Sequence, residues 1–114
     1  MVLDLFKSRR RARLRDKPAP KAWGAVLERN LPIFNRLTDE DQKELLSHVQ
    51  VFVAEKHFEG AGGLTLTEEI KVTIAAQACL LLLHRETDYY PELTSIIVYP
   101  TSYISEEQRY LGGG

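Results

Sequence analysis

The chain has 114 residues, of which 44% are hydrophobic and 27% charged, with a formal net charge of −1. This composition is typical of one small globular domain and excludes a disordered chain. The single cysteine excludes an internal disulfide. The longest apolar run, residues 70–83, falls short of the roughly 20 residues that span a bilayer. Because a very short apolar piece comes before the basic residues, the start does not match a secretory signal, and we do not expect a secreted protein.

Charge is distributed unevenly along the sequence. Residues 1–21 carry eight Lys or Arg and two Asp, whereas residues 22–114 carry seven Lys or Arg and fourteen Asp or Glu. We therefore expect residues 1–20 to form a basic, flexible arm that is dispensable for folding. Without interleaved aromatic residues, this arm predicts no specific nucleic-acid binding. Membrane-surface contact through the arm is a weaker alternative, which rests on Val2, Leu3, Leu5 and Phe6.

Two helices dominate the prediction for the rest of the chain, after a short helix that ends before Pro32. The first covers about residues 39–58, with Thr38 as its N-cap and three acidic residues in its first turn. Its buried stripe repeats at helical spacing and consists of Leu45, Leu46, Val49, Phe52 and Val53. We expect the glycine-rich stretch "GAGG" to end this helix.

The second main helix is predicted over about residues 68–84, with Thr67 as its N-cap. It is apolar almost all round, which predicts the central buried helix. The β-branched residues at its start leave a strand over residues 69–74 as an alternative, and residues 64–66 suit a short strand or an extended segment. The side chains expected in the core are Ile74, Ala78, Leu81 and Leu82.

A strand near residues 95–99 follows, and Pro100 ends it. Alternation places Ile96 and Val98 on one face, and Ile97 and Tyr99 on the other. The strand is either an edge that lines a cleft or an interior strand, and we favour the interior position. The connection before it, "HRETDYYPEL", is expected to lie on the surface. The fold class is therefore α+β.

The sequence predicts no catalytic, cofactor-binding or metal-ligating residue in this chain. His48 and His57 would lie on opposite faces of one helix, and Cys79 and His84 are also wrongly spaced for a shared ion. We expect the three histidines to lie at the surface or at helix ends. Cys79 is expected to be a buried, unreactive thiol.

The order and spacing of three stretches resemble the Mlc titration factor A family of zinc-dependent peptidases. These stretches are "LPIFNRLTDEDQKEL", "VQVFVAEKHFEGAGGLTLTEEIKVTIAAQACLLLL" and "TDYYPELTSIIVYP". The resemblance covers about 80 residues and implies a bacterial, cytoplasmic metallopeptidase of aminopeptidase type, with zinc on a His-Glu-x-x-His helix. The sequence lacks that motif, so the resemblance carries over scaffold elements only, and zinc is expected only in a full-length family member.

Two hypotheses follow from the resemblance. In the first, this chain is the non-catalytic N-terminal region of a zinc peptidase, with residues 21–114 belonging to a domain completed by a C-terminal catalytic region. In the second, the chain is a small stand-alone interaction module that binds a transcriptional regulator. In either case, we expect the isolated chain to bind no zinc tightly and to hydrolyse no peptide.

Overall fold

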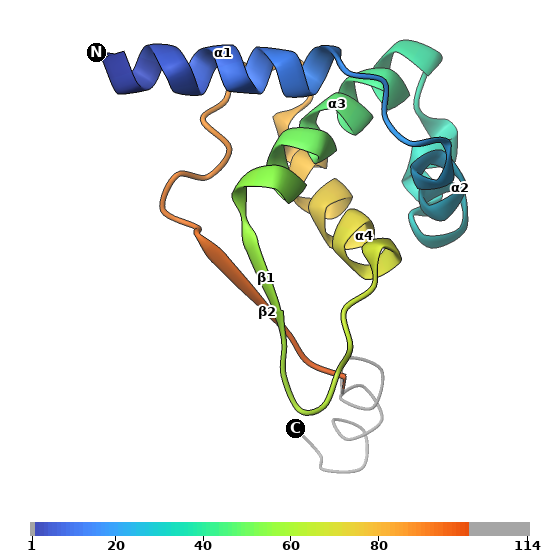
Figure 1. Cartoon of the computed structure of the whole chain (residues 1–114). Helices are drawn as coiled ribbons and strands as arrows, with labels where there is room; N and C mark the ends of the chain where they lie inside the picture. Colours follow the sequence, from blue (N-terminus) through green and yellow to red (C-terminus); the bar gives the residue numbers. More distant parts are fainter. Residues whose placement is uncertain (1, 101–114) are drawn as a thin grey trace.

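The computed structural model describes residues 2–100 and the side chains of residues 4–100. The end of the predicted domain, residues 101–114, lies outside the described residues. Helices and one pair of strands make up the fold, as the α+β prediction requires (Figure 1). In chain order these are α1 (Val2–Asp16), α2 (Lys21–Asn30), the 3-10 helix η1 (Pro32–Arg36), α3 (Asp39–Glu55), β1 (His57–Gly60), α4 (Glu68–Cys79), the 3-10 helix η2 (Leu80–Leu82) and β2 (Ser95–Val98).

The core lies between α2, α3 and α4, and α3 and α4 form the main helix pair (Figure 1). Thr38 and Thr67 cap the two helices as predicted, since their hydroxyls accept hydrogen bonds from the amides of Asp41 and Ile70 at 3.1 and 3.2 Å. The buried residues come mainly from these three helices: Trp23, Val26, Leu27, Leu31, Phe34, Leu45, Val49, Val51, Phe52, Val72, Ala75, Ala76, Cys79, Leu82 and Tyr89.

The prediction of a flexible arm over residues 1–20 is wrong, because most of this segment is the helix α1, which packs on α3 (Figure 1). Arginine, alanine and leucine favour the helix. Gln50 of α3 donates hydrogen bonds to the carbonyl oxygens of Leu14 and Lys17, which satisfies acceptors that the end of α1 leaves free. The contact between α1 and α3 is therefore largely polar. The number of apolar residues in α1 does not indicate such a contact.

The first main helix ends at Glu55, three residues before the predicted end, because Lys56 adopts an extended conformation that leads into β1. Gly60 is the last residue of β1, so the stretch "GAGG" ends a strand and not a helix. Gly62 and Gly63 have φ of +60° and +84°, which glycine adopts without steric cost, and they turn the chain towards α4. Residues 64–66 belong to neither a helix nor a strand.

The second main helix is also shorter than predicted. Regular α4 ends at Cys79, and η2 continues it to Leu82. The changed winding places Leu82 in the core, while Leu81 points outward with 70% of its surface exposed. The prediction of a core position is therefore confirmed for Leu82 and wrong for Leu81, and Ile74 and Ala78 are only partly buried.

Strands β1 and β2 form a parallel pair with His57 opposite Ser95 and Gly60 opposite Val98. Parallel neighbours need a long crossover, and α4 lies within it. Burial alternates along β2 as predicted, with Ile96 facing the core and Ile97 facing outward. Among residues 2–100, no helix combines the length and apolarity needed to cross a bilayer.

Candidate functional site

The first turns of α3 present two carboxylates on one side of the helix. Asp41 and Glu44 are three residues apart, which places their side chains next to each other on the helix surface. The Asp41 amide is fixed by its hydrogen bond to the Thr38 hydroxyl. Both side chains are partly exposed, at 24% for Asp41 and 31% for Glu44, so the pair is open to solvent and to ions.

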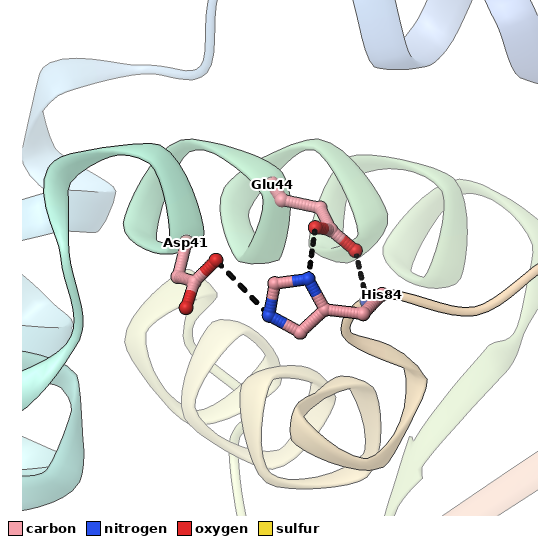
Figure 2. A group of neighbouring side chains, drawn as sticks. All are labelled: Asp41, Glu44 and His84. Carbon is pink, nitrogen blue, oxygen red and sulfur yellow. Dashed lines mark hydrogen bonds and ion pairs between the residues drawn. The ribbon is translucent and has the colours of Figure 1, made fainter.

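His84, which follows η2 and its C-cap Leu83, places its side chain beside these two carboxylates (Figure 2). Its backbone adopts φ of +65°, and its amide donates a 2.8 Å hydrogen bond to Glu44 Oε2. The ring Nε2 lies 3.2 Å from Asp41 Oδ1, and Nδ1 lies 3.9 Å from Glu44 Oε1. One possible ligand atom from each residue lies within 4.8 Å of the other two. We call Asp41, Glu44 and His84 the three-residue cluster.

A buried hydrogen-bond chain supports the cluster from the protein side. Arg15 donates to the Tyr89 hydroxyl at 3.2 Å, and this hydroxyl lies 2.6 Å from His48 Nδ1. Because the ionised Glu44 carboxylate can only accept, His48 Nε2 is the protonated nitrogen, and Nδ1 of the neutral ring accepts a hydrogen bond from the Tyr89 hydroxyl. His48 Nε2 then donates to Glu44 Oε2 at 3.1 Å. The chain therefore fixes both the tautomer of His48 and the position of the Glu44 carboxylate.

The pKa shifts agree with this assignment. Burial lowers the pKa of His48, and the nearby Glu44 opposes that effect only in part. Burial also acts to raise the pKa of Glu44, but hydrogen bonds from the His84 amide and from His48 outweigh it and lower that pKa. Burial raises the pKa of Tyr89. A neutral His48 beside an ionised Glu44 is therefore the state that the surroundings favour.

A second polar cluster attaches α1, and we call it the arginine clamp: Arg11, Glu55 and Asp88. Arg11 donates two hydrogen bonds to the Glu55 carboxylate, at 2.7 and 2.8 Å, and one to Asp88 Oδ1 at 2.6 Å. The side chains of Arg11 and Glu55 are about nine-tenths buried, with 9% and 10% exposed. The guanidinium lowers the pKa of both acids, and the acids raise the pKa of Arg11. This bidentate geometry is the strong form of an ion pair.

The histidine predictions have mixed outcomes. His84 lies at a helix end, as predicted, and its side chain is 68% exposed. His57 is exposed but belongs to β1, since α3 ends before it. The surface prediction is wrong for His48, which is only 6% exposed because it packs and hydrogen-bonds against Tyr89. Cys79 is buried as predicted, and burial raises its pKa to about 12.

The segment "HRETDYYPEL" is not only a surface connection. Tyr89 is fully buried, and Tyr90 donates a hydrogen bond to the carbonyl oxygen of Ala78 at 2.9 Å. Both tyrosines have φ near +55°, and Tyr89 lies in the core while Tyr90 packs against it. The segment therefore closes the core and carries both His84 and Asp88 to their partners.

Comparison with known proteins identifies the family. The model of the glucose-regulated metallo-peptidase M90 family matches residues 5–113. The chain belongs to this family. This confirms the resemblance to the Mlc titration factor A peptidases. Because the match begins at Leu5, it includes most of α1.

A relative in Synechocystis sp. (strain ATCC 27184 / PCC 6803 / Kazusa), described as an uncharacterized protein, is 36% identical over 94 residues. These residues make up 82% of this chain and 34% of the relative. The chain therefore spans about a third of the length of the curated relative it matches. No solved structure matches the chain.

The residues present do not fit the zinc site that the family implies. His-Glu-x-x-His does not occur in the sequence. His48 uses both ring nitrogens in hydrogen bonds to Tyr89 and Glu44, and His57 lies on β1, away from the helix that carries His48. No two histidines among the described residues share a ligand cluster. We therefore derive no step of peptide hydrolysis from this chain.

Sequence reasoning missed the three-residue cluster for a definable reason. The three-residue spacing of Asp41 and Glu44 is a signal that could have indicated a shared helix face. Nothing in the sequence showed that His84, forty residues further on, returns to that face, because the approach depends on how α4 packs on α3 and on the turn at His84.

Proposed function

We propose that this chain is the non-catalytic scaffold of a bacterial, cytoplasmic, zinc-dependent peptidase of aminopeptidase type. The catalytic residues would come from a C-terminal region outside this sequence. Membership of the M90 metallo-peptidase family supports the enzyme class. The absence of a His-Glu-x-x-His motif from the sequence supports a role without direct catalysis.

The observation that carries the proposal is the uncovered face of the β1–β2 pair. Phe58 and Ile96 pack against the helical core on one face. On the other face, Ile97 is 51% exposed, and Tyr99, which follows the strand, is 57% exposed. Parallel sheets occur almost only with both faces covered, and two strands alone are marginally stable. This face therefore suits a further layer of the same enzyme.

The outer edge of β2 suits an added strand as well. The Val98 carbonyl oxygen accepts a hydrogen bond from the Ala61 amide at 2.9 Å, so the backbone of Val98 points towards β1. Because successive peptide groups of a strand point to opposite sides, the amide and carbonyl of Ile97 point away from β1. A strand from the catalytic region would pair there and make β2 an interior strand, the position that the sequence analysis favours.

The test uses the region encoded downstream of codon 114. We expect an open frame there that encodes His-Glu-x-x-His. The 114-residue chain with zinc should not hydrolyse aminoacyl p-nitroanilides, whereas a mixture of the chain with the separately produced downstream region should do so. Hydrolysis by the chain alone would contradict the scaffold role. A missing frame, or a mixture that stays inactive, would favour the stand-alone module that binds a regulator.

A pair of matched variants locates the docking surface. Ile97→Asp places a charge on the uncovered face and should reduce the activity of the mixture at least tenfold. Leu81→Asp places the same charge on a side chain that is 70% exposed and belongs to η2, so activity should stay within about twofold of the unchanged chain. Equal effects from the two variants would remove the β1–β2 face as the docking surface.

A further inference from the structure

We propose that the three-residue cluster is a binding site for a divalent transition-metal ion, with Zn²⁺ as the ion that suits it best. The ion would join the first turns of α3 to the end of the α4–η2 segment. Asp41 and Glu44 would each contribute one carboxylate oxygen, and His84 would contribute one ring nitrogen. This inference does not depend on the proposed function, because the site is read out by binding and not by peptide hydrolysis.

The distances carry the first step. Zinc binds imidazole nitrogen at 2.0–2.1 Å and carboxylate oxygen at about 2.0–2.2 Å, which places neighbouring ligand atoms of a tetrahedral site about 3.3–3.5 Å apart. His84 Nε2 lies 3.2 Å from Asp41 Oδ1, which is close to this spacing, whereas the 3.9 Å distance to Glu44 Oε1 is from the other ring nitrogen, Nδ1. Since all three ligand atoms lie within 4.8 Å of one another, small side-chain rotations suffice to close them around an ion (Figure 2).

The second step concerns what holds the ligands before an ion arrives. Outside the cluster, buried His48 donates a hydrogen bond to Glu44 Oε2, and Tyr89 fixes His48 in turn. The His84 amide donates to the same oxygen. Oε2 is therefore engaged by the protein, and Oε1 is the oxygen turned towards the His84 ring. Metal-binding carboxylates are commonly oriented in this way by hydrogen-bonded neighbours.

The third step concerns the choice of ion. One nitrogen and two oxygens are a mixed set, and imidazole favours Zn²⁺, Ni²⁺ and Cu²⁺ over Mg²⁺ and Ca²⁺, which prefer oxygen ligands throughout. Two carboxylates also supply two negative charges to balance the ion. Three protein ligands leave a fourth position for water. We therefore expect moderate affinity, which is compatible with the prediction that this chain has no tight zinc site.

Binding should stabilise the fold, because the ligands come from elements forty residues apart and meet only in the folded chain. At tenfold the dissociation constant, free Zn²⁺ should raise the Tm of the 114-residue chain by roughly 5–10 °C. Isothermal titration should show one saturable site per chain. The same concentration of Mg²⁺ should leave the Tm unchanged, and a chelator should reverse the zinc effect.

Two matched pairs of variants assign the site. His84→Asn keeps a residue that tolerates a positive φ but removes the imidazole, and Asp41→Asn removes one carboxylate. Each should weaken zinc binding at least tenfold. The controls are His57→Asn, which removes an exposed imidazole from β1, and Asp39→Asn, which removes another acid from the first turn of α3. Both controls should bind zinc as the unchanged chain does.

Cobalt gives a readout that does not depend on stability. Co²⁺ bound in a four- or five-coordinate site should show visible absorption bands that saturate at one ion per chain and disappear in His84→Asn. The proposal is overturned if neither Zn²⁺ nor Co²⁺ binds saturably. It is also overturned if His84→Asn and His57→Asn bind equally well, since the three side chains would then form only an ion pair.

Discussion

The α3–α4 core and the α1 attachment belong to one small domain but are held by different kinds of contact. Leu45, Val49 and Phe52 of α3 are completely buried among apolar neighbours. Helix α1 is attached through the arginine clamp, the Gln50 hydrogen bonds and the contact of Arg15 with Tyr89. The core depends on apolar surface removed from water, whereas the α1 attachment depends on a few polar groups that must find specific partners.

This difference teaches which parts of the fold the sequence can predict. Apolar residues at helical spacing and the two threonine caps are local patterns that located α3 and α4, and the β-branched residues before Pro100 located β2. The partners of Arg11 lie 44 and 77 residues away, and no local pattern marks them. A basic segment with few apolar residues therefore suggested a flexible arm, although it docks as a helix.

The largest expected effect is on the core. Replacing Leu45, which is fully buried, by alanine should lower the free energy of unfolding by about 2–5 kcal/mol, because it removes apolar contacts and leaves a cavity. Leu81→Ala is the matched control, and its cost should stay below about 0.5 kcal/mol because the side chain is mostly exposed. Urea unfolding followed by circular dichroism measures both. Equal losses would contradict the placement of these two leucines.

The arginine clamp should show the next largest effect. Arg11→Ala leaves Glu55 nearly buried without its partner, and we expect a loss of about 2–3 kcal/mol, less than for a fully buried pair because Asp88 stays in contact with water. Arg10 lies 3.8 Å from Glu55 and is 57% exposed, so Arg10→Ala should cost about 0–1 kcal/mol. If Arg11→Ala were neutral in urea unfolding, α1 would be the dispensable arm that the sequence suggested.

Mild acid should lower the stability of the fold through protonation of His48. Its pKa is lowered in the fold, mainly by burial, so the unfolded chain binds a proton more readily. The free energy of unfolding should therefore fall as the pH decreases through about 6.5, the usual histidine value, towards the lower value in the fold. His48→Gln should flatten this part of the profile. An unchanged slope in that variant would mean that His48 does not titrate against folding.

Stronger acid should lower the stability of the fold further, through protonation of Glu55. Arg11 lowers the pKa of this carboxyl in the fold, so its contribution is present above the usual glutamate value and is lost as the pH falls below about 4.3. Comparison of Arg11→Ala with the unchanged chain between pH 3 and 6 measures this effect together with the smaller one on the more exposed Asp88, and the sum is expected to be the smallest effect of the four. The unchanged chain should lose more stability over this range, and parallel profiles would contradict the assignment.

At the candidate site, too, local sequence patterns could be read but contacts between residues far apart in the sequence could not. The sequence contains no His-Glu-x-x-His motif, and the three-residue spacing of Asp41 and Glu44 is a signal that could have placed these two carboxylates on one helix face. It could not place His84, whose approach requires a left-handed backbone conformation after η2 and the packing of α4 on α3. It also could not place Tyr89 behind His48, because tyrosine in a polar stretch gives no local sign of burial.

The central claim is that the β1–β2 pair of this chain receives a catalytic region, and the Ile97 amide tests it most directly. Hydrogen exchange followed by NMR should show fast exchange of this amide in the 114-residue chain, because it points away from β1. Addition of the downstream region should slow exchange at Ile97 at least a hundredfold, while the Val98 amide, which faces β1, changes less. Unchanged exchange at Ile97 in an active mixture would contradict the claim.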